Sequence, residues 1–229
     1  MTRHRRWTRP LRRSTLAVGL LLAAAALGAC GPVLAGTAAV VGSERITVAQ
    51  LEREVGQLSA ERTRLGLPAA TPGQLLRGRL LTDILQQLVA QAAAGQGITV
   101  TQGEVDAFLA RQKQQLGGEA GLARWLAQND VPVSAMGDFL RAQVQSGKLV
   151  DQAVPGASTQ ARQQAFEQIV ISTSERLGVR VSPRFGSWEP RAGGLVPAPA
   201  DLSTPAAGTT PGGSGGPAGG ATPAPTPSP

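Results

Sequence analysis

The sequence predicts a mainly α-helical domain of about six helices with a small two-stranded ribbon, followed by a disordered C-terminal tail. Between residues 38 and 190, apolar side chains recur at helical spacing in segments bounded by glycine, proline and capping residues. A short Val-rich run, typical of a strand, lies at each end of this region. From residue 191 the chain is rich in Pro, Gly, Ala and Thr and has little to bury, which predicts disorder.

The first 29 residues have the pattern of an export signal. Six arginines and no acid are followed by an unbroken apolar run from Leu16 to Leu27, which is too short for a permanent membrane span. Arg12-Arg13 leaves a twin-arginine route open beside the general secretory route. The arginines are Arg3, Arg5, Arg6, Arg9, Arg12 and Arg13.

Cys30 is the only cysteine of the chain, and it directly follows Leu27-Gly28-Ala29. A signal that ends in small residues and then Cys resembles the lipobox of bacterial lipoproteins. This resemblance implies cleavage before Cys30, a lipid on its thiol and attachment to the extracytoplasmic face of the cell membrane. The alternative is an ordinary signal peptide with a cysteine at this position by chance. With a lipid on Cys30, residues 30–37 form a short tether between the membrane and the domain.

Removing the signal changes the charge balance. The whole chain has 22 basic and 15 acidic residues and a net charge of +7. Without the six signal arginines the net charge is +1, and aromatic residues make up only 3% of the chain. A basic stripe and stacking aromatics, the usual means of binding nucleic acid, are therefore missing, and we expect no nucleic-acid partner.

The domain is expected to begin with a strand at residues 38–42, which turns at Gly42-Ser43. Thr47 is a candidate N-cap for a first helix with Leu51, Val55 and Leu58 on one face. Thr71-Pro72 is a cap followed by proline at the first helical position, and Gly95 and Gly97 mark the end of this second helix. Its wide apolar stripe predicts a central core helix. The stripe contains Leu75, Leu76, Leu80, Leu81, Ile84, Leu85, Leu88, Val89, Ala92 and Ala93.

Four further helices are expected. Thr101 and Glu104 form a capping-box pattern, and Gly117-Gly118 ends the helix that they begin. A short helix around Trp125 follows, and the next begins near Pro132 and ends before Pro155-Gly156. The last covers residues 159–177, and residues 179–181 have the pattern of a strand.

Few residues offer catalytic chemistry. His4 is the only histidine and lies in the signal, there is no tyrosine, and a lipid would occupy the Cys30 thiol. We therefore expect no Ser-His or Cys-His catalysis, no metal site and no cofactor. The carboxylate pairs Glu52/Glu54 and Glu104/Asp106 are spaced by two, which directs the members of each pair to different sides of a helix. They are interpreted as solvated helix faces.

The order of elements resembles one family. The run Ala39-Val40-Val41-Gly42 continues through Ile46-Thr47 into a helix, and Leu88-Val89-Ala90-Gln91 lies in a long Leu-rich helix. A step follows from Gly97-Ile98-Thr99-Val100-Thr101 to Glu104-Val105. This pattern is similar to the N-terminal domain of SurA- and PrsA-type extracytoplasmic chaperones. The segment from Leu177 to Trp188 looks like the part that completes the module in SurA-like lipoproteins, with Phe185 in place of the usual Tyr.

The resemblance implies a helical domain over residues 38–190 in which the first strand pairs with the strand at 179–181. Trp188 is expected to cover the helices. Many members of the family carry a parvulin-type prolyl isomerase domain between the fifth and last helices, where this chain has only Val154 to Ser158. Isomerase activity is therefore not expected.

The function that the resemblance implies is that of a membrane-anchored, ATP-independent chaperone for unfolded exported polypeptides. Trp125, Met136, Phe139 and Leu140 are the candidate client-binding residues of an apolar surface, and core packing is the alternative for all four. Two other functions remain open: an envelope docking lipoprotein with one dedicated partner and, less favoured, a peptidyl-prolyl isomerase.

Overall fold

The computed structural model describes residues 36–197, and these form six α-helices, two short 3-10 turns and five short strands. The mainly helical fold class is thus confirmed. Cys30, the lipobox and the signal lie outside the described residues, as does the chain beyond residue 197. Among the described helices, none is long and apolar enough to cross a membrane.

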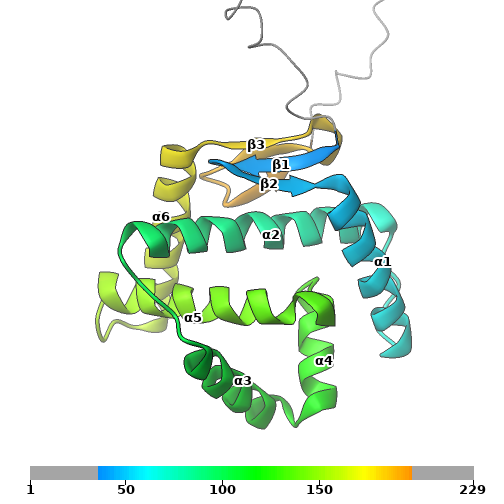
Figure 1. Ribbon diagram of the computed structural model, residues 1–229, viewed down its shortest axis with the longest axis horizontal. Coiled ribbons are helices and arrows are strands. Elements are labelled where there is room, and N and C mark those ends of the chain that lie inside the picture. The colour runs from blue at the N-terminus through cyan, green and yellow to red at the C-terminus, as the bar shows by residue number, and fades with distance from the viewer. Residues whose placement is uncertain (1–35, 198–229) are drawn as a thin grey trace, which may run out of the picture.

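A three-stranded antiparallel sheet joins the two ends of the domain (Figure 1). Strand β1 (Thr37–Val41) lies in the middle, between β2 (Glu44–Thr47) and β3 (Val179–Val181). Val40 is opposite Arg180, and Val41 is opposite Val179, as expected for the predicted ribbon. The structure adds β2 as a third strand through the turn at Gly42, where a φ of 61° suits glycine.

Three threonine caps begin helices as predicted, because each satisfies a backbone N–H that the first helical turn leaves free. Thr47 accepts from Gln50 at the start of α1 (Val48–Arg64). Thr71 begins α2 (Pro72–Gly95) with a full capping box. Thr101 does the same for α3 (Gln102–Leu116).

Helix α2 is the centre of the domain. It packs against β1 on one side and against α1, α5 (Met136–Ala153) and α6 (Thr159–Leu177) on the others. Figure 1 shows it lying between the sheet and α5. Residues of its apolar stripe belong to two separate clusters of the hydrophobic core, which confirms the expected central position. The apolar side chains buried along it are Leu75, Leu80, Ile84, Leu88, Val89, Ala92 and Ala93.

The far end of the molecule is a helical corner made by α3, α4 (Glu119–Gln128) and the start of α5 (Figure 1). A second apolar cluster holds these elements together through Val105, Leu122, Leu126 and Leu140, among others. The described chain begins and ends at the opposite end, beside the sheet (Figure 1). Only Val154 to Ser158 separate α5 from α6.

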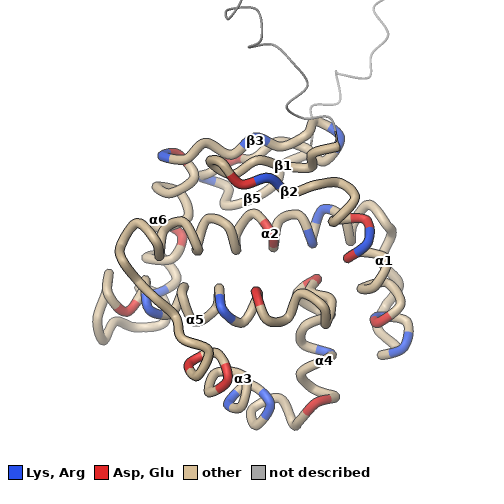
Figure 2. Tube along the Cα trace, viewed as in Figure 1, with Lys and Arg blue, Asp and Glu red and all other residues tan. Residues whose placement is uncertain are grey.

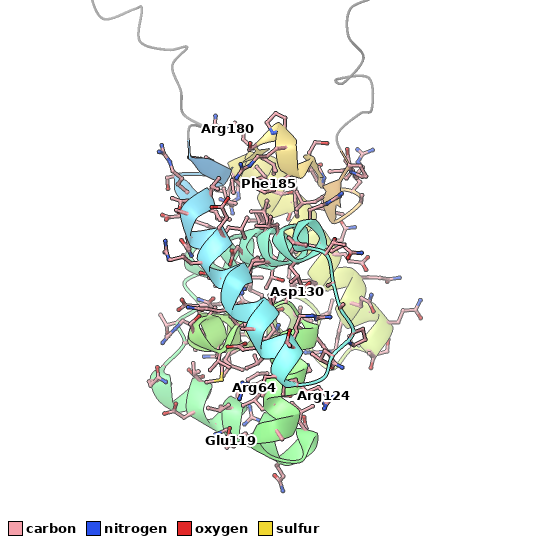
Figure 3. All side chains as sticks on the ribbon, turned by 90° about the vertical axis from the view of Figure 1, so that its right-hand side faces the viewer. Arg64, Glu119, Arg124, Asp130, Arg180 and Phe185 are labelled. Carbon is pink, nitrogen blue, oxygen red and sulfur yellow. The ribbon has the colours of Figure 1, made fainter. Side chains whose placement is uncertain are left out.

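The ordered chain extends past residue 190, where the sequence places the start of the disordered tail. Strand β4 (Ser187–Glu189) pairs with β5 (Gly194–Val196) in a hairpin, with Trp188 opposite Leu195. Both of these side chains pack against the main core, as does the buried Phe185 that precedes them (Figure 3). The hairpin therefore exists because two apolar residues in a polar segment find a surface to cover.

Candidate functional site

The four predicted client-binding residues come together in the helical corner, but half of them are buried. Phe139 is 5% exposed and Leu140 is 1% exposed, so Leu140 presents no surface to a partner and Phe139 contributes only a small part of its ring to the wall of a cavity described below. Trp125 and Met136 are half-buried and pack against the same cluster. The rings of Trp125 and Phe139 lie 5.3 Å apart in a tilted arrangement. These contacts hold α4 against α5, which is a packing role.

A different surface offers apolar contacts, and we call it the apolar groove. It consists of two neighbouring cavities along α2 and α6 that share Leu85 and Phe166. The first cavity, of about 370 Å³, lies between α2, α5 and α6. The second, of about 350 Å³, lies between α2, α6 and the turn of the β4–β5 hairpin. Further apolar lining comes from Val89, Phe139, Ala142, Val170 and Ile171. Polar side chains line the rest of the two cavities: Thr82, Gln86, Asn129, Gln143, Ser146, Glu167 and Arg191.

On the other side of the α2–α5 contact lies a polar cleft of about 430 Å³. Its walls come from β2, α1, α2 and α5, and Figure 2 shows both signs of charge along these elements. Gln86 and Ala142 line both the polar cleft and the apolar groove, so the two surfaces are separated only by the α2–α5 contact. The other polar and charged residues of the cleft are Arg45, Gln50, Arg53, Glu54, Gln57, Arg79, Asp83, Gln87, Ser134, Asp138, Arg141 and Gln145.

The floor of the polar cleft is a buried charge network centred on Arg79, which is 2% exposed. Its Nε donates to Glu54 Oε2 at 2.6 Å across the α1–α2 contact. Its Nη2 lies 2.5 Å from Asp83 Oδ1, one helical turn further along α2. Arg79 Nη1, Asp83 Oδ2 and Gln86 Nε2 are buried without a hydrogen-bond partner. Two unmatched donors and one unmatched acceptor therefore lie within two turns of one helix.

Burial raises the pKa of Asp83 from 3.8 to about 7. Loss of solvation is the main cause, and the nearby charges of Glu54 and Asp138 act in the same direction. The Arg79 guanidinium lowers this pKa but only partly offsets the burial. At neutral pH the carboxyl group of Asp83 is therefore close to its titration midpoint.

Stability should consequently fall as the pH rises from about 4 to 7. In this range the folded protein keeps a proton on Asp83 that the unfolded chain has released, so unfolding becomes easier with rising pH. The total change is on the order of 2–4 kcal/mol. Urea unfolding of residues 31–229 across this range measures it. The Asp83→Asn variant should lose this part of the pH dependence. The control Asp106→Asn, at an exposed carboxylate of α3, should follow the wild-type curve. If stability fell equally steeply with pH in Asp83→Asn and in wild type, the assignment of this pH dependence to Asp83 would be wrong.

The structure corrects one sequence interpretation. Glu54 is not a solvated carboxylate: its side chain is 15% exposed and pairs with Arg79, whereas Glu52 points outward with 59% exposure. The spacing argument placed the two on different sides correctly. Glu104 combines its capping role with an ion pair to Lys148 at 2.5 Å, and these contacts lower its pKa from 4.5 to about 2.

The sequence contains a signal for the Arg79 network that spacing could have revealed. Arg79 and Asp83 are opposite charges four residues apart, inside the apolar stripe of α2 rather than opposite it. Within residues 36–197, no group of three or more potential ligands is arranged to hold a metal ion. Comparison with known proteins finds no matching family model, no matching curated protein and no matching solved structure.

Proposed function

We propose that this protein is a membrane-anchored, ATP-independent chaperone that binds unfolded exported polypeptides on the extracytoplasmic face of the membrane. The export signal and Cys30 support the location. The SurA-like order of strand, long helix and Gly97–Val105 step supports the activity. The observation that carries the proposal is the apolar groove, since adjoining cavities that share Leu85 and Phe166 suit an extended apolar segment.

The proposed mechanism is reversible shielding. Apolar contacts are non-directional, so one groove can hold many different sequences and release them without a nucleotide. Leu85, Phe166 and Ile171 are half-buried rather than fully exposed. Among the described residues, Val133 is the one large apolar side chain that is substantially exposed, at 45%. Such a surface keeps the free chaperone from associating with itself.

The anchor would hold the domain close to the membrane. Five residues lie between Cys30 and Gly36, and the six residue steps that join these two positions span at most about 22 Å when fully extended. Because Gly36 lies beside the sheet, the sheet end would face the membrane and α3 and α4 would point away from it (Figure 1). The groove between α2, α5 and α6 would then lie along the side of the domain, within reach of emerging chains.

Aggregation of unfolded proteins tests this function. Residues 31–229, which lack the acylated thiol, should suppress the light scattering of several unrelated unfolded proteins at stoichiometric excess and without ATP. Protection of a single protein only would favour the docking lipoprotein instead. Turnover of a proline-containing tetrapeptide, measured beside it, would favour the isomerase. Absence of protection for every protein tested would overturn the proposal.

A further inference from the structure

The polar cleft has the chemistry of an amide-binding site. Its charged lining is nearly balanced, with four arginines against three carboxylates, so it favours neither an anion nor a cation strongly. Five glutamines add side chains that each donate and accept, and they come from α1, α2 and α5. These are Gln50, Gln57, Gln86, Gln87 and Gln145.

The polar atoms without a partner in the cleft floor match a ligand that both accepts and donates hydrogen bonds. Arg79 Nη1 and Gln86 Nε2 need acceptors, whereas Asp83 Oδ2 needs a donor when the carboxyl group is ionised and an acceptor when it is protonated. Arg79 is nearly fully buried and held by Glu54 and Asp83, so its position is fixed by the fold. A peptide main chain supplies a carbonyl oxygen and an N–H in regular alternation, and it carries no net charge.

We infer that the polar cleft binds the main-chain amides of an extended client segment, with Gln86, Gln87 and Gln145 at its walls and Arg79 and Asp83 at its floor. The inference rests on the proposed chaperone function and names how a client is recognised. The apolar groove would take side chains, and the polar cleft would take backbone. Gln86 and Ala142 border both surfaces, so one client can reach from one to the other. Main-chain recognition suits a chaperone because every client has the same backbone.

A peptide with almost no side chains provides the test. An acetylated, amidated peptide of alternating Gly and Ser is titrated into ¹⁵N-labelled residues 31–229, and side-chain amide and backbone shifts are followed by NMR. Shifts should concentrate on the cleft glutamines. The same peptide with N-methylglycine in place of glycine loses half of its N–H donors, and we expect at least about threefold weaker binding.

Substitutions of single glutamines test whether the peptide binds in the polar cleft. Gln86→Met and Gln87→Met remove cleft amides while keeping chain length, and each should weaken peptide binding about three- to tenfold. Gln91→Met, on the same helix but outside the cleft, is the matched control and should bind as wild type does. Thermal unfolding of each variant verifies that the fold is intact.

The outcomes distinguish failure of the main-chain inference from failure of the chaperone proposal. Equal binding of the N-methylated peptide, or tighter binding of a polyglutamate or polylysine peptide, would overturn the inference. If wild type suppresses aggregation while the peptide causes no shifts in the cleft, the inference fails and the chaperone proposal stands. If the peptide binds in the cleft while no unfolded protein is protected, the chaperone proposal fails.

Discussion

Replacing Arg79 by methionine is expected to lower the free energy of unfolding by about 3–5 kcal/mol at pH 8. The substitution leaves Glu54 and Asp83 facing the same buried space without a cation, at side-chain exposures of 15% and 9%. Removing one partner of a buried ion pair costs more than removing the whole pair, because the remaining charge keeps its loss of solvation. Urea unfolding monitored by circular dichroism measures the change.

Two further variants test whether the loss of stability comes from the buried charge network. Arg53→Met, at an exposed arginine of α1 whose bond stays within its own helix, should change stability by less than about 0.5 kcal/mol. The triple variant Glu54→Leu, Arg79→Met, Asp83→Leu removes all three charges and should recover most of the loss. A triple variant less stable than Arg79→Met alone would contradict the account of the network.

The second large effect is expected at Gly121, in the first turn of α4. An added Cβ would lie 1.7 Å from the carbonyl oxygen of Leu116, a backbone atom that cannot rotate away. The α3–α4 turn through Gly117 and Gly118 holds the two helix ends this close together. Gly121→Ala must therefore move backbone, and we expect a loss of about 3 kcal/mol or more.

Gly56→Ala is the matched control for Gly121→Ala. Gly56 is also helical, and an added Cβ there meets no atom within 4 Å. Alanine has the higher helix propensity, so this change should raise the free energy of unfolding by about 0.5–1 kcal/mol. If the two variants had the same stability, the close approach of α3 and α4 at Leu116 would be wrong.

The local signals of the sequence predicted the fold well. Caps and stops depend on side chains within a few residues, so Thr71 with Gln74 and Thr101 with Glu104 could be recognised without tertiary information. The apolar stripe of α2 predicted its central place, because its width requires neighbours on several sides. The pairing of β1 with β3 came from the family resemblance, since these strands are far apart in the chain.

Features that depend on tertiary partners could not be predicted in this way. The β4–β5 hairpin lies in a segment with the composition of a tail, and only the surface that Trp188 and Leu195 cover makes it ordered. The ion pair of Arg79 with Glu54 joins residues 25 apart across two helices. Met136 and Leu140 were predicted to line a groove, but the packing of α4 on α5 makes them part of a core.

The central claim is that the apolar groove binds unfolded chains, and a matched pair of charge substitutions on α5 tests it most directly. Ser146→Glu places a carboxylate in the groove, and Gln152→Glu adds the same charge at an exposed position outside it. Suppression of aggregation is measured for both variants and wild type with several unrelated unfolded proteins. We predict that wild type and Gln152→Glu protect equally and that Ser146→Glu protects much less while its thermal stability is unchanged. Equal protection by Ser146→Glu and Gln152→Glu would contradict the claim.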